Sequence, residues 1–187
     1  MHVDRRVVVL SILLVVAALS WWWSLEGEMP RMGARAPSTE RSDYSFSGLV
    51  VSEMSPQGEL VDTLSADRLV HYPDRESSLL DNPRLVFYNG PVRAWDVVAR
   101  SGTVLEADRS VVFDGDVTVA YAGEAPGQGF ELYTDQLHVW PDARRAETDK
   151  AVRIVQPAAV IESVGLQAQL DSRTFTLLSQ VRGTYEP

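Results

Sequence analysis

Residues 66–88 read ADRLVHYPDRESSLLDNPRLVFY, and the pattern of this stretch returns three times further along the chain. It overlays without gaps on residues 99–121 (ARSGTVLEADRSVVFDGDVTVAY) and 134–155 (TDQLHVWPDARRAETDKAVRIV), while residues 165–185 (GLQAQLDSRTFTLLSQVRGTY) fit with one residue fewer. The four starts lie 33, 35 and 31 residues apart, and Asp81, Asp114 and Asp149 each stand fifteen residues after a start. A period of this length indicates a repeat architecture, in which each unit buries its apolar face against its neighbours.

Short β-branched and aromatic runs separated by turn residues fill each unit, which is typical of strands and not of a helical array such as ankyrin. Alternation is clearest at Val117, Val119 and Tyr121, and it returns at Val152 and Ile154. We count a dozen or more short strands, each with one buried face. The sequence therefore predicts an all-β domain of stacked antiparallel hairpins, as in a jelly roll or a β-solenoid, with an unpaired strand edge at each end.

Residues 7–23 read VVVLSILLVVAALSWWW, a run of seventeen residues without a charge that follows Arg5 and Arg6. As a helix this run spans roughly 25 Å, at the short end of what crosses a bilayer. The arginines predict that residues 1–6 lie in the cytoplasm and that the chain after the run lies outside it. A cleaved signal peptide is the alternative, because Ala18-Leu19-Ser20 has the form of a cleavage site, but the tryptophan triplet favours an uncleaved transmembrane anchor.

Residues 24–42 contain glycines, prolines and scattered charges without an apolar period, so we expect a flexible linker before a folded domain at 43–187. The chain carries a net charge of −9, and the part after the anchor carries −10, which argues against a nucleic-acid binder. The absence of cysteine excludes disulfides, a thiolate nucleophile and cysteine-ligated zinc. The single lysine, Lys150, stands outside any Gly-rich phosphate loop, which excludes a Walker-type ATPase site.

His71 and His138 are the only histidines after the anchor, and with neighbouring aspartates such as Asp67 they suggest an acid/base or metal site. Asp67 and His71 are four residues apart along one strand, too far for direct contact, and spacing places no third ligand, so we favour structural roles. The triplet Asp114-Gly115-Asp116 lacks the longer ligand series of a calcium loop and is better explained as a hairpin turn. We therefore expect no catalytic residue, no metal and no cofactor.

Four segments carry a resemblance to a known family: SPQGELVDTLSADRLVHYPDR (55–75), LLDNPRLVFY (79–88), VRAWDVVARSGTVLEADRSVVFDGDVTV (92–119) and VRGTYE (181–186). With these segments the chain resembles the lipopolysaccharide-export protein C family (LptC) over residues 44–187. The resemblance implies a V-shaped β-jellyroll in the periplasm, anchored in the bacterial inner membrane by a single N-terminal helix, whose interior holds lipopolysaccharide acyl chains. It also implies that the N-terminal edge receives lipid from an inner-membrane ABC transporter, made of a permease pair and an ATPase, and that the C-terminal edge passes it to a periplasmic jellyroll bridge protein.

The residue chemistry agrees with acyl-chain binding, because each methylene removed from water gains about 0.8 kcal/mol, whereas a net charge of −10 repels an anionic headgroup. We expect an apolar trough with the headgroup outside. The candidate lining residues, for which a dry core is the alternative, are Leu69, Leu80, Leu85, Phe87, Trp95, Val104, Phe113, Leu137 and Val139. The resemblance implies partner contacts on the transporter edge at Phe46, Leu49 and Val51, and on the bridge edge at Phe175, Leu177, Val181 and Tyr185.

Three interpretations of function stay open from the sequence. The leading hypothesis is a conduit that relays lipopolysaccharide without covalent chemistry. A second is an assembly scaffold that joins the membrane complex to the bridge without carrying lipid. A third is an exported hydrolase that uses His71 or His138.

Overall fold

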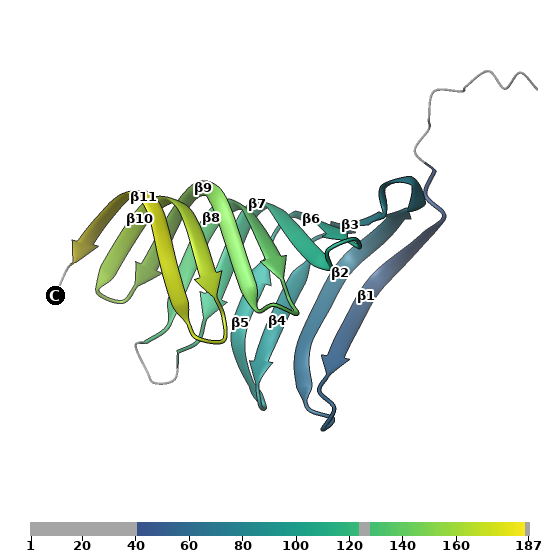
Figure 1. Cartoon of the computed structure of the whole chain (residues 1–187), viewed down its shortest axis with the longest axis horizontal. Coiled ribbons are helices and arrows are strands. Elements are labelled where there is room, and N and C mark those ends of the chain that lie inside the picture. Colours follow the sequence, from purple (N-terminus) through teal and green to yellow (C-terminus); the bar gives the residue numbers. More distant parts are fainter. Residues whose placement is uncertain (1–40, 124–127, 186–187) are drawn as a thin grey trace, which may run out of the picture. The chain divides into compact units, whose positions relative to one another are not determined.

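The computed structural model describes residues 41–123 and 128–185, in which eleven antiparallel strands form one sheet (Figure 1). The all-β prediction is confirmed, and the strands are longer than we expected. The predicted anchor at 7–23 and all but the end of the predicted linker lie outside the described residues, among which no helix is long and apolar enough to cross a membrane. The elements are β1 (Tyr44–Met54), β2 (Leu60–Tyr72), the 3₁₀ turn η1 (Pro73–Arg75), β3 (Ser77–Asp81), β4 (Arg84–Asn89), β5 (Val92–Val98), β6 (Ser101–Leu105), β7 (Ser110–Tyr121), β8 (Phe130–Trp140), β9 (Arg145–Gln156), β10 (Ala159–Gln169) and β11 (Thr174–Tyr185).

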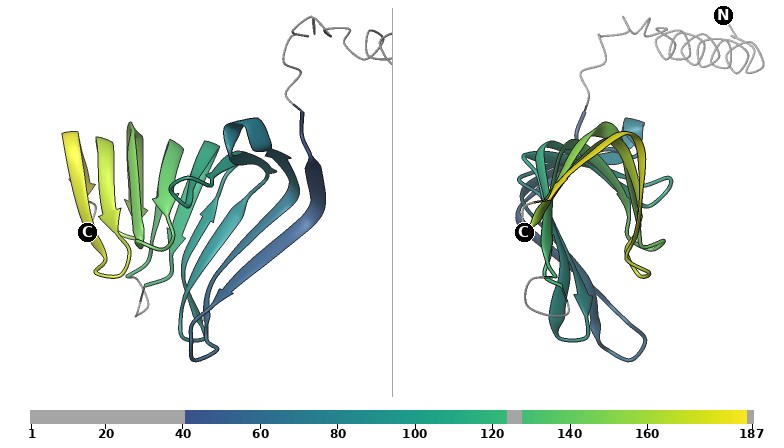
Figure 2. Two further views of the ribbon diagram at one scale, coloured as in Figure 1. Left: turned by 45° about the vertical axis from the view of Figure 1, so that its right-hand side comes forward. Right: turned by 90° about the vertical axis from the view of Figure 1, so that its left-hand side faces the viewer.

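The sheet folds over on itself into two walls, which Figure 2 (right) shows from the β11 end as the two legs of an arch. The first wall consists of residues 60–65, β4, β5, 117–121, 130–134, 152–156, 159–164 and 179–185. The second wall consists of residues 68–72, β3, β6, 110–114, 137–140, 145–148, 166–169 and 174–177. β1 pairs with β2 along both walls.

The strands change wall along one line, which we call the corner, where the ladders lose their regular register. Register shifts fall between Asp114 and Val117 in β7 and between Val164 and Leu166 in β10. Left-handed backbone angles mark the same line at Gly48 (φ 66°), Asn82 (φ 48°), Gly115 (φ 78°) and Gly165 (φ 82°). The prediction of a hairpin turn at Asp114-Gly115-Asp116 was wrong, because the triplet is a bulge that bends β7 at the corner. A bulge and a turn both place a glycine in the left-handed region, so the sequence pattern is the same for the two. Such bulges let one long strand serve both walls.

The sequence repeat corresponds to one passage through both walls. Ala99, Thr134 and Gly165, which start three of the units, lie at the corner, and the chain returns to the corner just after Asp81 and Asp114. From the start of one unit to the start of the next, the chain makes a hairpin in the second wall and then a hairpin in the first wall. Backbone bonds tie neighbouring units together across the corner, from Asn82 N–H to Arg100 O (2.9 Å) and from Arg100 N–H to Gly115 O (2.9 Å).

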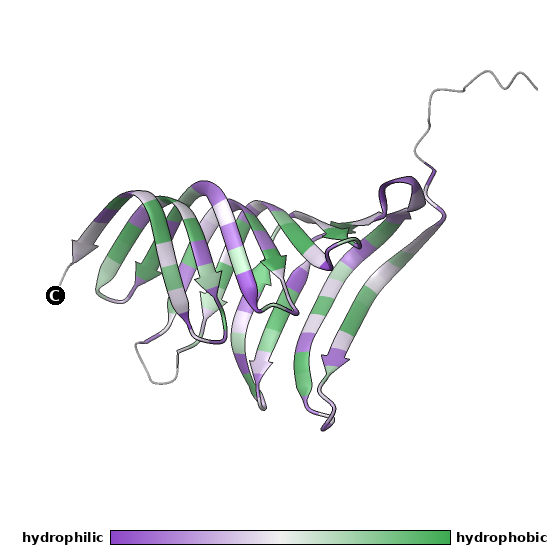
Figure 3. Ribbon diagram, in the orientation of Figure 1, coloured by the Kyte–Doolittle hydropathy of each residue, from purple (hydrophilic) through white to green (hydrophobic). Residues whose placement is uncertain are grey.

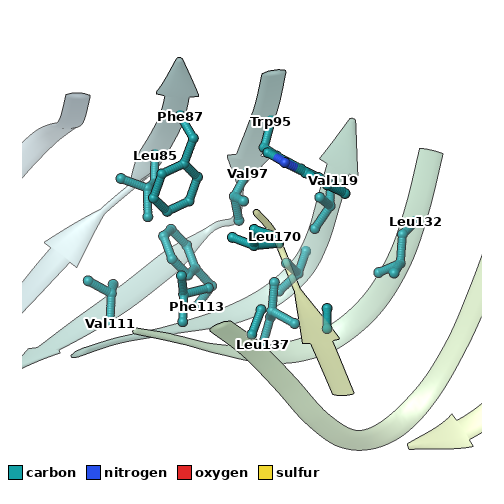
Figure 4. Packing of buried hydrophobic residues seen from close by; sticks show 14 of the residues in the cluster. Leu85, Phe87, Trp95, Val97, Val111, Phe113, Val119, Leu132, Leu137 and Leu170 are labelled. Atoms are coloured by element: carbon teal, nitrogen blue, oxygen red, sulfur yellow. The ribbon is translucent and has the colours of Figure 1, made fainter. Parts of the chain in front are cut away.

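The core lies between the two walls, toward which every second residue of each strand points. The colouring in Figure 3 alternates along the strands accordingly, and Val117, Val152 and Ile154 are buried as the alternation predicted. Phe87 from the first wall and Phe113 from the second are fully buried. Figure 4 shows them among the buried side chains of one cluster. A buried side chain of this size contributes up to about 3 kcal/mol, so this cluster holds the walls together.

Candidate functional site: the interior between the walls and the two sheet edges

The nine residues predicted to line a lipid trough all belong to the interior. Seven of them are buried, with at most 4% of their surface exposed, and Leu69 and Val104 are partly buried against the same cluster. The first wall supplies Leu85, Phe87 and Trp95, and the second wall supplies Leu69, Leu80, Val104, Phe113, Leu137 and Val139. The structure therefore brings all nine together on facing surfaces.

The interior is closed in this structure. Side chains of both walls, among them Trp95, Leu132 and Leu170, enclose a cavity of about 20 Å³. A cavity of this volume has room for about one water molecule. Near the open ends of the walls, the Trp95 ring lies edge-on to Phe175, with ring centroids 5.8 Å apart, and thereby joins the first wall to the second. The apolar surface exists, but the two walls cover it with each other.

The N-terminal edge is formed by β1, whose pairing partner in the described part of the chain is β2. Two of its three predicted contact residues, Phe46 and Val51, are each 53% exposed. The third, Leu49, is partly buried and packs against the core. Val50 and Met54 are also exposed, so this edge presents both a free backbone ladder and apolar side chains. An edge of this kind is suited to accept another strand.

The C-terminal edge is formed by β11, which pairs with β10. Its predicted contact residues divide into two groups. Phe175 and Leu177 pack against the core, whereas Val181 and Tyr185 are exposed by 54% and 70%. Leu178 was not among the predicted residues, yet it is 52% exposed on the same strand. The part of the edge that is open to a partner is therefore 178–185.

His71 holds the start of β1 in place. Its Nδ1 lies 2.6 Å from Asp43 Oδ1 and its Nε2 lies 2.9 Å from Glu106 Oε1, while its ring stacks on Tyr44 at 4.5 Å. Both nitrogens must donate to bond two carboxylates, so this imidazole is protonated. The hydrogen bond to Asp43 accordingly raises the pKa of His71, and the same bond lowers the pKa of Asp43. Through these contacts His71 joins the start of β1 to β2 and to the turn between β6 and β7.

His138 belongs to a group with the composition of a hydrolase triad but not its geometry. The Ser110 hydroxyl donates to Asp108 Oδ1 (2.5 Å), so His138 Nε2 at 2.7 Å donates to Ser110 Oγ. In a hydrolase the histidine would accept the serine proton instead. Ser110 is also fully buried, and burial lowers the pKa of His138. This group ties β7 to β8 and gives no support to the hydrolase hypothesis.

The remaining polar groups singled out from the sequence have ordinary structural partners. Asp67 accepts a hydrogen bond from Asn82 Nδ2 at 2.8 Å, and Asp114 accepts one from Gln136 Nε2 at 2.8 Å. Asp116 forms an ion pair with Arg100. No group of three or more potential metal ligands occurs among the residues that the structure describes. The carboxylates of the Asp-Gly-Asp triplet therefore stabilise the corner.

Sequence reasoning missed part of the interior and its rim. The missed interior residues include Val97, Leu132 and Leu166, which strand alternation alone would have indicated. Arg93, Arg144 and Arg173 were also missed. They line a concave site of about 700 Å³ where the open ends of the walls meet, which we call the mouth. No local pattern marks them, because they come from the start of β5 and from two turns that are distant from it in sequence.

Comparisons with known proteins agree with this architecture. The fold is similar to the crystal structure of LptH, described as the LptA homologous periplasmic component of the conserved lipopolysaccharide transport device from Pseudomonas aeruginosa, with a TM-score of 0.53 and 8% identity. The match covers 67% of this chain and 95% of that one. No curated protein matches the chain by sequence. Residues 9–186 match the family described as "Lipopolysaccharide-assembly, LptC-related", and the chain therefore belongs to this family.

Proposed function

We propose that this protein is a conduit that shelters lipopolysaccharide acyl chains between its two walls and relays them without covalent chemistry. The observation that carries the proposal is the continuous apolar interior, to which every strand from β2 to β11 contributes side chains and which ends at an open strand edge on each side. Family membership supplies the ligand class. The protein acts without a cofactor and is not an enzyme.

The closed interior sets a condition on this function: the walls must separate to admit a chain. Separation breaks apolar contacts between the walls, and an acyl chain replaces them with contacts of the same kind. About ten methylenes that leave water for the interior gain about 8 kcal/mol, which offsets the cost of opening. The walls are joined at the corner by backbone bonds but at the mouth mainly by side chains, so opening is expected to start at the mouth.

The two edges give the conduit a direction. In this proposal β1, which follows the expected membrane anchor at 7–23 and linker at 24–42 in the sequence, docks on the inner-membrane ABC transporter. The exposed part of β11 docks on the periplasmic bridge protein. Strand addition at both edges would place the apolar interiors in line, since each added jellyroll would continue the same two walls. The domain at 43–187 then lies in the periplasm.

A photocrosslinking amino acid at Leu80 tests the conduit, with Leu79 as the matched control. Leu80 is 1% exposed and faces the interior, whereas its neighbour Leu79 is 40% exposed on the outer face of the same strand. We expect lipopolysaccharide adducts in cells from position 80 and from Phe113, and none from position 79. Adducts at neither interior position, or equal adducts at 79 and 80, would contradict the conduit.

The scaffold remains the second candidate, and one observation favours it. A cavity of about 20 Å³ holds no acyl chain, so in this conformation the domain joins partners without carrying lipid. The same crosslinking experiment separates the two functions. A scaffold gives protein–protein adducts from Phe46 and Val181 but no lipid adducts from Leu80.

A further inference from the structure

Three second-wall turns end in an arginine with left-handed backbone geometry. The residues are Arg109 (φ 51°), Arg144 (φ 48°) and Arg173 (φ 55°), and Glu76 (φ 47°) holds the same position in the first turn of the row. Arg144 closes its turn with a bond from its N–H to Pro141 O at 3.0 Å. Glycine or asparagine adopts this conformation at less cost than any long side chain. The backbone conformation alone therefore does not account for arginine at these positions, and the surroundings of the side chains become relevant.

Two of these arginines, with Arg93 from the start of β5 in the first wall, line the mouth. Among the described residues that line the mouth, Asp171 is the one with an acidic side chain. Trp95 and Leu170 line both this site and the small cavity beneath it. The mouth thus combines a positively charged rim with direct access to the apolar interior.

Arg144 reaches from the second wall across to the first. Its guanidinium lies over the Phe87 ring, 5.0 Å from the ring centroid. Asp62, on the first wall beside Phe87, also lies within electrostatic range of Arg144, and burial raises the pKa of this carboxyl despite that positive charge. The neighbouring carboxylate of Asp142 pairs with Arg109 at 3.1 Å instead. Arg144 therefore acts as a closing contact between the walls.

We propose that Arg93, Arg144 and Arg173 form an anion-binding entrance, which takes the phosphate groups of an amphipathic lipid and draws Arg144 away from Phe87 as it does so. This inference rests on the proposed conduit and adds a headgroup site to it. A guanidinium binds phosphate oxygens in a bidentate manner, and a partly exposed cation–π contact is weak, so a phosphate competes with the ring. Recognition of the headgroup and opening of the walls become one event.

This entrance changes what the net charge implies. A charge of −10 spread over the exported part predicted that an anionic headgroup stays away from the protein. The arginines concentrate positive charge at an opening of the interior, where a lipid whose chains lie inside would present its phosphates. Repulsion from distant carboxylates is screened beyond about 8 Å at physiological salt, whereas the arginines act in contact.

The test uses the full-length chain in lipid nanodiscs, with the photocrosslinker at Leu80, and compares lipid A carrying its phosphates with the same lipid after dephosphorylation. The triple variant with Arg93→Gln, Arg144→Gln and Arg173→Gln is expected to crosslink the phosphorylated lipid about tenfold less. This factor corresponds to a loss of roughly 0.5 kcal/mol for each of three exposed contacts. Dephosphorylated lipid is expected to crosslink at least as well as in the unmodified protein, both in the triple variant and in Arg144→Gln alone, because each lacks the closing contact with Phe87. Arg153→Gln, an equal charge change on the exposed outer face of β9, is the control and leaves both lipids within twofold.

Equal loss of crosslinking for both lipids in the triple variant, or no loss for either, would overturn the entrance while the conduit stands.

The single variant Arg93→Gln keeps the test valid if the triple variant folds poorly, because Arg93 is exposed. Its replacement is expected to lower crosslinking of the phosphorylated lipid alone, by about twofold. Competition by millimolar inorganic phosphate that disappears in the triple variant would show that the site also takes the free ion. Absence of such competition would show that the site takes phosphate only as part of a lipid whose acyl chains lie in the interior. If neither lipid crosslinks to the unmodified protein, the conduit itself fails.

Discussion

β1 and β11 are both terminal strands of the same sheet, but they are attached in different ways. Of the eleven residues of β1, only Leu49 packs against the core, and the strand depends on its ladder with β2 and on the polar contacts of His71. β11 buries Phe175 and Leu177 in the interior and leaves residues 178–185 outside. The N-terminal edge is therefore held by polar contacts that can be released, and the C-terminal edge is fixed at one end and open at the other.

Truncation after Leu177 should have the largest effect on this comparison. It removes the exposed part of β11, including Val181 and Tyr185, but keeps Phe175 and Leu177 in the core. We expect complete loss of binding to the periplasmic jellyroll partner in a pull-down, with binding to the membrane complex retained. Retained binding of the jellyroll partner would refute the assignment of this edge. Removal of all of β11 is a poorer experiment, because it also opens the core.

Alanine substitutions measure how differently the two strands are attached. Phe175→Ala should lower the free energy of unfolding by about 2–3 kcal/mol, since the ring packs against Trp95 and Phe130 in the interior. Phe46→Ala removes the same side chain from a site that is 53% exposed and should cost less than about 0.5 kcal/mol. Chemical denaturation of the two variants checks both values. Equal losses would mean that β1 is as firmly packed as β11.

The His71 contacts predict a smaller, pH-dependent effect confined to β1. Because the pKa of His71 is raised above its ordinary value of 6.5, its contribution is complete below about pH 6.5 and is lost as pH rises through the folded-state pKa. The pKa of Asp43 is lowered, so its contribution is lost only when pH falls below about 3.8 toward the folded-state value. Amide hydrogen exchange of residues 44–47, corrected for intrinsic rates, should therefore quicken at alkaline pH while β11 is unchanged.

Two histidine variants provide the control for that experiment. His71→Gln should remove the pH dependence of β1 exchange, because glutamine cannot carry the charge that bonds Asp43 and Glu106. His138→Gln should leave β1 unaffected, since His138 contacts Ser110 and Trp140 on other strands. A pH dependence that survives His71→Gln would refute the polar attachment of β1.

The repeat made the all-β class, the two terminal strands and the apolar interior predictable, because alternation is local and a period of 31–35 residues is visible in the chain. The contacts that close the molecule were not predictable in this way. His71 meets Asp43 from 28 residues away, and Arg144 meets Phe87 from the opposite wall. Such pairs depend on the strand register and on the corner bulges. A glycine in the sequence does not show whether the chain forms a bulge or a hairpin turn there, since both use the left-handed conformation.

The central claim is that the walls separate to admit acyl chains, and a distance across the mouth tests it most directly. The chain has no cysteine, so Asn89→Cys and Ser172→Cys introduce unique spin-label sites at exposed turns of the first and second wall. With lipopolysaccharide bound, double electron–electron resonance should show the distribution between these labels shifting to longer distance by several ångströms. An unchanged distribution with lipid bound would contradict the account.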